Sequence, residues 1–167
     1  MSLVVGIDPG LSGALAVLDA DGSVECVHDL PIIRDRSLAW IDRGELQSLI
    51  VSALQGRTAH AIVERVSSMP KQGIGSAFLF GCGFGSILGV LQALHLPIMF
   101  VTPAVWKGFY GLSKDKHASL HKGRLLYPTA ELRLARHDGR AEALLIARFG
   151  LTHSAGKARI PRREAAL

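Results

Sequence analysis

Apolar runs separated by short polar turns characterise the first part of the chain. The run Leu3–Asp8 predicts a buried strand, and Ala14–Leu18 predicts a second strand after a glycine-containing turn. The pair Asp21-Gly22 is a strong hairpin signal and predicts a third strand over residues 24–30. The chain therefore opens as an antiparallel meander of three strands.

The apolar pattern then changes to a helical period. Residues 31–37 are polar and charged, so we expect a loop there. Asp42 precedes apolar positions at helical spacing and has Glu45 three residues later, which resembles a capping box and predicts a helix. The run Ala59–Glu64 then predicts a short buried strand, parallel to the first because a helix intervenes.

The rest of the chain alternates in the same way. After an exposed loop at 67–75, the pattern predicts a long helix at 76–94, a fifth strand at 97–101, a short helix from Thr102-Pro103, a helix at 114–127 and a last helix at 140–149 ended by Gly150. This order, βββαβαβ followed by helices, predicts an α/β fold of the ribonuclease H-like type, with a five-stranded mixed sheet flanked by helices. We expect one ribonuclease H-like nuclease domain over residues 1–150 and a basic, mobile tail over residues 151–167.

Composition narrows the class of partner. The chain has 167 residues, of which 49% are hydrophobic, and this is enough to form one hydrophobic core. The formal charge of +5 and a pI of about 9.6 favour an anionic partner, either nucleic acid or a membrane surface. Cys26 and Cys82 lie in apolar surroundings and are expected to be buried small hydrophobes rather than a disulfide.

One stretch raises the question of a membrane. Residues 74–96 are apolar enough to resemble a transmembrane helix, but glycines interrupt them and no aromatic anchors flank them. We therefore expect an interface helix, with core packing as the alternative on another face, and no membrane partner. No signal peptide precedes the first strand, so we expect a cytoplasmic protein.

Four acids in three places carry the candidate chemistry. Asp8 and Glu64 end the first and fourth strands, which lie side by side in a ribonuclease H-like sheet. Asp138 and Glu142 are four residues apart at a helix start and share one face. Carboxylates that converge in this way suit Mg²⁺, and two ions about 4 Å apart can stabilise the attacking and leaving oxygens of a phosphodiester.

Each acid also has a simpler interpretation. Asp8 could belong to a strand-ending turn, and Glu64 could pair with Arg65 at the surface. Asp138 could cap a helix, and Glu142 could be a solvated helix residue. The four acids together are harder to dismiss than any one of them.

Four segments resemble the RuvC-type Holliday junction resolvases, in particular their phage or viral-like branch. These segments, which span residues 3–149, are IDPGLSGAL, the strand end IVE, TPAVWKGFYGLSKDKHASL and HDGRAEALLIA. The resemblance implies a homodimer that binds four-way DNA junctions and makes paired symmetric nicks with Mg²⁺ or Mn²⁺. It also implies that the protein acts in the cytoplasm of a bacterial or phage-infected cell.

The family motifs also imply the catalytic and metal-binding acids. They match Asp8, Glu64 and Glu142, the last within AEAL where ADAL is usual. The remaining acid of the family falls on Gly139, and Asp138 lies one residue earlier, so we assign Asp138 as the fourth ligand. His137 is an alternative ligand or proton shuttle, with a structural or DNA-contacting role equally open.

The resemblance also implies DNA contacts. Resolvases carry, shortly after the second acid, an aromatic residue that wedges into the junction, whereas residues 65–70 here contain no aromatic residue. Met69 could insert between base steps in its place, although packing of Met69 under the loop is the preferred interpretation. The residues expected to contact phosphates are Lys107, Lys114, Lys116 and Arg140, with further basic residues at Lys122, at Arg124 and in the tail.

Other functions fit parts of the pattern. The chain could be a different ribonuclease H-like nuclease acting on flaps or RNA–DNA hybrids, or a catalytically silent junction-binding protein. An actin-like ATPase or sugar kinase shares the opening turn, but such proteins need two lobes and a second phosphate-binding glycine loop.

Overall fold

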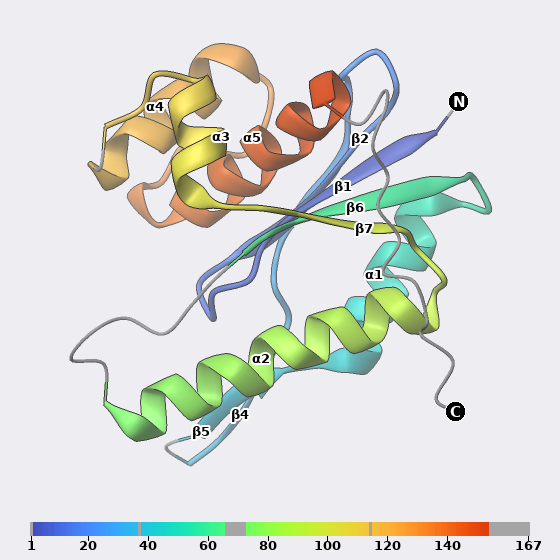
Figure 1. Ribbon diagram of the computed structural model, residues 1–167, viewed down its shortest axis with the longest axis vertical. Coiled ribbons are helices and arrows are strands. Elements are labelled where there is room, and N and C mark those ends of the chain that lie inside the picture. The colour runs from blue at the N-terminus through green and yellow to red at the C-terminus, as the bar shows by residue number, and fades with distance from the viewer. Residues whose placement is uncertain (1, 37, 66–72, 114, 154–167) are drawn as a thin grey trace, which may run out of the picture.

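The computed structural model describes residues 2–36, 38–65, 73–113 and 115–153, and it is built on a five-stranded mixed sheet (Figure 1). The strand order is β3-β2-β1-β6-β7. β1 pairs antiparallel with β2 and parallel with β6, as the predicted topology requires. The strands are β1 Leu3–Asp8, β2 Ala14–Leu18, β3 Val24–Asp29, β6 Ala59–Glu64 and β7 Ile98–Val101.

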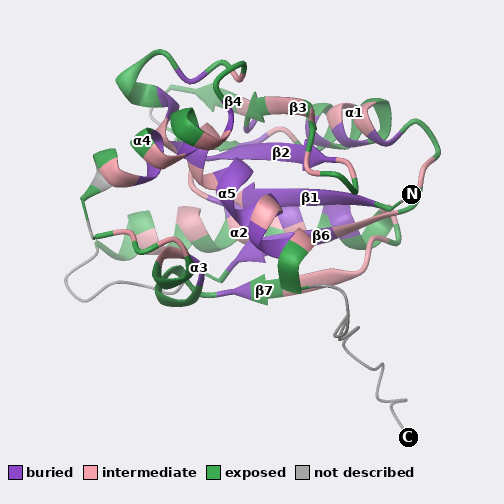
Figure 2. Ribbon diagram, turned by 90° about the horizontal axis from the view of Figure 1, so that it is seen from above, coloured by how far each residue is buried: buried purple, intermediate pink, exposed green. Residues whose placement is uncertain are grey.

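Helices cover both faces of the sheet and confirm the predicted ribonuclease H-like α/β fold. In Figure 1, α1 (Arg43–Leu54) and α2 (Ile74–Ala93) lie on one face. The opposite face carries α3 (Pro103–Phe109), α4 (Lys116–Leu126), the 3-10 turn η1 (Ala135–His137) and α5 (Asp138–His153). Two apolar clusters fill the two layers, and Figure 2 shows that β1 and β2 are buried between them.

The helix α5 lies unusually close to the central strands because glycines occupy the contact. A Cβ at Gly6 on β1 would collide with the backbone of α5 at Ala143 and Ala147. A Cβ at Gly150 on α5 would collide with Ile62 of β6. Gly150 was predicted to end the last helix, but it instead lies within α5 and lets the helix continue to His153.

Three other expectations need correction. Residues 31–37 were expected to be a loop, but β4 (Ile32–Asp35) pairs with β5 (Leu38–Ile41) in a separate hairpin. The last helix begins at Asp138, two residues earlier than predicted. Cys82, expected to be buried, is exposed on α2. The predicted cap of α1 is confirmed, since the Asp42 carboxylate accepts the Glu45 N–H at 3.0 Å.

The long helix α2 has one buried and one exposed side. Ile87 and Leu91 are fully buried against the sheet, whereas Ile74 is 91% and Phe78 69% exposed. By length and composition alone it is the one helix in the described part of the chain that is apolar enough to cross a membrane. Its packing through Ile87 and Leu91 gives it a place in the α1–α2 layer of this fold.

Candidate metal centre

The two strand-end acids lie on adjacent parallel strands. β1 and β6 are in register, with Ile7 opposite Val63, so Asp8 and Glu64 follow at the same edge of the sheet. Glu64 is only 7% exposed. Its side chain accepts a hydrogen bond from Trp106 rather than facing solvent beside Arg65. The central strands therefore place two carboxylates side by side, Glu64 buried and Asp8 half-buried.

Glu142 reaches the same place from the first turns of α5. Asp8, Glu64 and Glu142 each offer one carboxylate oxygen, and these oxygens lie within 4.8 Å of one another. We refer to these three residues as the carboxylate cluster. Three anionic oxygens at this separation form a donor set of the kind that hard divalent cations such as Mg²⁺ prefer. The residues present therefore fit a metal ion.

Asp138, the fourth predicted acid, is the first residue of α5 and lies near the carboxylate cluster without belonging to it. Its charge contributes to raising the pKa of Asp8. One Asp138 oxygen accepts the N–H of Gly139 at 3.1 Å. Asp138 therefore acts on Asp8 through its charge and is not one of the three acids whose oxygens lie within 4.8 Å of one another.

Gly139, the position onto which the predicted fourth acid of the motif would fall, lies directly against Asp8. A Cβ at Gly139 would stand 3.3 Å from Asp8 Oδ2 and only 2.5 Å from the carbonyl oxygen of Ser12. The close approach of the turn after β1 to the start of α5 thus leaves no room for a side chain at 139.

Burial and mutual repulsion make the cluster a poor place for negative charge. The pKa of Asp8 is raised to about 7, first by burial and then by the charges of Glu142 and Glu64, against one opposing N–H from Gly10. Burial also raises the pKa of Glu64, with Glu142 adding to the effect, while Trp106 and Lys107 oppose it. A bound cation would relieve this repulsion, which is a second reason why the site fits a metal.

The helix α3 provides hydrogen-bond donors to two acids of the cluster. Trp106 Nε1 donates to Glu64 Oε1 at 2.8 Å. Lys107 Nζ forms an ion pair with Glu142 Oε1 at 2.8 Å and lies 5.0 Å from the centre of the Trp106 ring. From α4, Ser119 Oγ donates to the same Glu142 oxygen at 2.9 Å.

Sequence reasoning missed the roles of Trp106 and Ser119. The acid pattern gives no indication of which donors fold against it. One signal was present for Trp106, because a tryptophan buried in the core requires an acceptor for its indole N–H. Ser119 gives a weaker signal of the same kind, because it is only 1% exposed and its buried hydroxyl group also requires a hydrogen-bond partner.

The remaining predicted contacts lie in different places. Arg140 forms a bidentate ion pair with Asp29, in which Nε lies 2.6 Å from Oδ1 and Nη2 lies 2.8 Å from Oδ2. These hydrogen bonds hold the pKa of Asp29 below its usual range. His137 is 3% exposed, and its Nδ1 has no hydrogen-bond partner among the described residues. Lys116 begins α4, whereas Lys114, Met69 and the tail beyond His153 lie outside the described residues.

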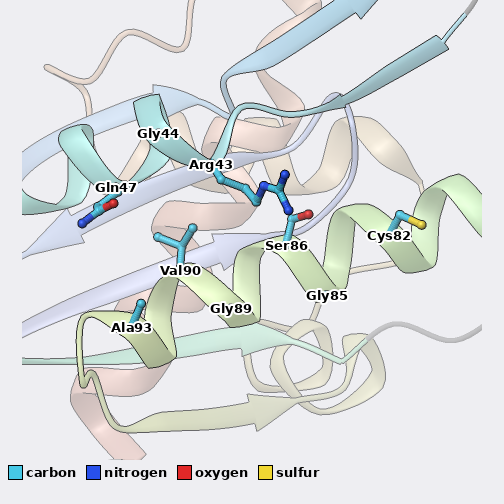
Figure 3. Close-up of a pocket in the computed structure, with 9 residues that line it drawn as sticks. All are labelled: Arg43, Gly44, Gln47, Cys82, Gly85, Ser86, Gly89, Val90 and Ala93. Carbon is cyan, nitrogen blue, oxygen red and sulfur yellow. The ribbon is translucent and has the colours of Figure 1, made fainter.

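A groove lies on the other face of the sheet, away from the carboxylate cluster. This groove of about 570 Å³ runs between α1 and α2 (Figure 3). Arg43 and Gln47 line it from α1, and Gly85, Gly89 and Val90 line it from α2. The groove shares no residue with the carboxylate cluster.

Comparison with solved structures supports the fold. The chain superposes on Thermus thermophilus RuvC in complex with a Holliday junction substrate with a TM-score of 0.59 and 20% identity, covering 91% of this chain and 92% of that one. A second T. thermophilus RuvC structure gives a TM-score of 0.54 at 20% identity, covering 91% and 93%. No protein-family model and no curated protein matches the chain. The similarity confirms the predicted RuvC-type architecture at the level of the fold.

Proposed function

We propose that this protein is a metal-dependent endonuclease that resolves four-way DNA junctions by paired symmetric nicks. The observation that carries the proposal is the meeting of Asp8, Glu64 and Glu142, with oxygens within 4.8 Å, on a fold shared with a junction-bound RuvC. The basic charge of +5 agrees with a polyanionic substrate.

The three cluster acids would hold Mg²⁺ or Mn²⁺, two ions per site in our proposal, with Asp138 as the fourth and outermost acid. Bound there, the ions supply Lewis-acid stabilisation of the attacking and leaving oxygens of the phosphodiester. Glu64, buried on β6, and Glu142, fixed by Lys107 and Ser119, keep their oxygens oriented before any ligand arrives. Such preorganisation reduces the rearrangement required when the substrate binds.

Several basic residues are proposed to contact DNA phosphates. Lys107 stands beside the cluster, and a substrate phosphate would compete with Glu142 for its ammonium group. Arg140 would have to exchange Asp29 for a phosphate, so we expect a smaller contribution from it than from Lys107. Lys114, Lys116 and Met69 remain proposed DNA contacts on sequence grounds.

We also propose that the active form is a homodimer that associates through α2. Ile74 and Phe78 expose large apolar side chains on this helix, and the Cβ positions of Gly81, Gly85 and Gly89 are open. Small residues at intervals of four allow another helix to approach closely. In the RuvC-type family the corresponding helix lies at the dimer interface, and paired nicks require two sites at a fixed separation.

The decisive assay is cleavage of a synthetic four-way junction with Mg²⁺. Asp8→Asn and Glu142→Gln should bind the junction in a mobility-shift assay but cut it at least about 100-fold more slowly, because each removes one anionic metal ligand. The matched control is Asp35→Asn, an exposed acid of the β4–β5 hairpin, which should cut like wild type.

Other results would change the proposal. Undiminished cleavage by both cluster variants would rule out the site. Preferential cutting of flaps or RNA–DNA hybrids in competition with the junction would favour a different nuclease on this fold. Junction binding without any cutting in Mg²⁺ or Mn²⁺ would favour a silent junction-binding protein.

A further inference from the structure

We propose that Trp106 is a positioning residue that fixes the Glu64 carboxylate for metal binding. This inference rests on the proposed metal centre and adds a residue that the acid pattern does not contain. Trp106 would touch neither metal nor substrate. It would act through the hydrogen bond from its indole N–H to one oxygen of Glu64.

The geometry of this hydrogen bond is well defined. Trp106 is fully buried, and its Nε1 lies 2.8 Å from Glu64 Oε1. An indole N–H can only donate, so it requires an acceptor when buried. Trp106 donates to Oε1 of Glu64, so Oε2 receives no hydrogen bond from the indole. A glutamate loses considerable rotamer freedom when it is fixed, and here the rigid ring provides that restraint in advance.

The neighbouring residue strengthens the argument. Lys107 follows Trp106 on α3 and holds Glu142 Oε1 at 2.8 Å. Two consecutive residues of one short helix thus contact two acids that belong to β6 and α5. The helix α3 therefore restrains one oxygen of the Glu64 carboxylate and one oxygen of the Glu142 carboxylate.

A purely structural role for Trp106 makes a different prediction. As a core side chain it packs in the same apolar cluster as Val101 and Leu120. If packing were its only role, Trp106→Phe would lower the unfolding temperature and leave the metal affinity of the folded protein unchanged. A positioning role requires that the metal affinity itself falls.

The first measurement is Mn²⁺ binding by calorimetry on the full chain. Trp106→Phe, which keeps an aromatic ring but loses the donor, should weaken Mn²⁺ binding about 10-fold or more, the usual effect of removing a partner that orients a ligand. Trp40→Phe is the matched control, because Trp40 lies on β5 of the hairpin and should leave the affinity unchanged. Thermal unfolding of each variant confirms that it is folded.

The second measurement needs no variant of Trp106. The chain has two tryptophans, so Trp40→Phe leaves a single indole N–H resonance in a nitrogen-correlated NMR spectrum. Titration with diamagnetic Mg²⁺ should shift this resonance, and the shift should saturate together with the calorimetric binding curve. This readout tests the proposal even if Trp106→Phe does not fold.

The outcomes separate the inference from the proposed function. If wild type binds Mn²⁺ and Trp106→Phe binds it equally well, the positioning role is wrong while the metal centre stands. An indole resonance that stays fixed during saturation with Mg²⁺ overturns the role in the same way. If wild type binds neither ion, the metal centre itself fails and the role of Trp106 fails with it.

Discussion

Asp8 occupies a position that is unfavourable for its own charge. Burial is the main cause, and the carboxylates of Glu142 and Glu64 add repulsion, so its pKa rises from 3.8 to about 7. A residue that served only to end a strand would gain nothing from this environment. The unfavourable energy has a function if a cation arrives, because the same three oxygens then become attractive ligands.

This residue should make the stability of the metal-free protein depend on pH. A pKa raised on folding means that the folded state binds the proton more tightly than the unfolded chain does. The resulting stabilisation is complete below about pH 4 and is lost as the pH rises through about 7. Between pH 5 and pH 8 we expect wild type to lose roughly 2 to 3 kcal/mol of unfolding free energy from this group, and Asp8→Asn to lack that loss. Urea unfolding in EDTA at pH 5 and pH 8 measures the difference.

Two controls define this result. Asp35→Asn should follow the wild-type pH profile, because Asp35 is exposed in the hairpin. Mg²⁺ should stabilise wild type at pH 8 more than at pH 5, since protonated Asp8 is a poor ligand. An Asp8→Asn profile parallel to that of wild type would contradict the assignment of the raised pKa to Asp8.

At the scale of elements, strong patterns were predictable and weak ones were not. The strands β1, β2 and β6 follow from continuous apolar runs, and their order follows from the intervening helix α1. The β4–β5 hairpin was missed because its strands have only four residues each, and because the charged residues 34–36 at the end of β4 were interpreted as part of a loop. The C-terminal end of α5 was misplaced because Gly150 was interpreted as a helix stop, whereas it is required for contact with Ile62.

The candidate site was predictable to a similar extent. Asp8 and Glu64 could be brought together because the carboxyl ends of adjacent parallel strands share an edge. The donors Trp106 and Ser119 could not be placed, because their positions depend on how α3 and α4 pack on α5. Sequence spacing determines which residues share an element but says little about how separate elements orient toward each other.

The contact between α5 and β1 gives a prediction at this scale. Gly6→Ala should destabilise the protein by roughly 3 kcal/mol, because the added methyl group meets the backbone of Ala143 and Ala147, which cannot rotate away. We also expect weaker Mn²⁺ binding, since a displaced α5 carries Glu142 with it. Chemical denaturation and calorimetry measure the two effects.

A second glycine serves as the control. Gly108 on α3 has no atom within 4 Å of its Cβ position, so Gly108→Ala should leave stability unchanged or raise it by up to about 1 kcal/mol through helix propensity. Equal stability of Gly6→Ala and wild type would show that α5 does not depend on this close approach.

The sheet separates two sides of the molecule to which we have assigned different proposed functions. The α3–α5 layer contributes Glu142 and the donors of the metal centre, whereas the other layer presents α2 (Figure 1). The exposed side chains of Ile74 and Phe78 lie on the second layer and take no part in the metal centre. A dimer formed through α2 would therefore leave both metal centres accessible to DNA.

The dimer gives the prediction at this scale. Phe78→Glu places a charge on the exposed face of α2 and should convert a dimer to a monomer without unfolding it, because Phe78 is 69% exposed within one chain. Sedimentation velocity at micromolar concentration measures the change. Leu125→Glu is the matched control, because Leu125 is 64% exposed on α4 and should leave the mass unchanged. On a four-way junction, the Phe78→Glu monomer should make unpaired single nicks where wild type makes paired ones. A monomeric wild type, or a dimeric Phe78→Glu variant, would show that α2 is not the dimer interface.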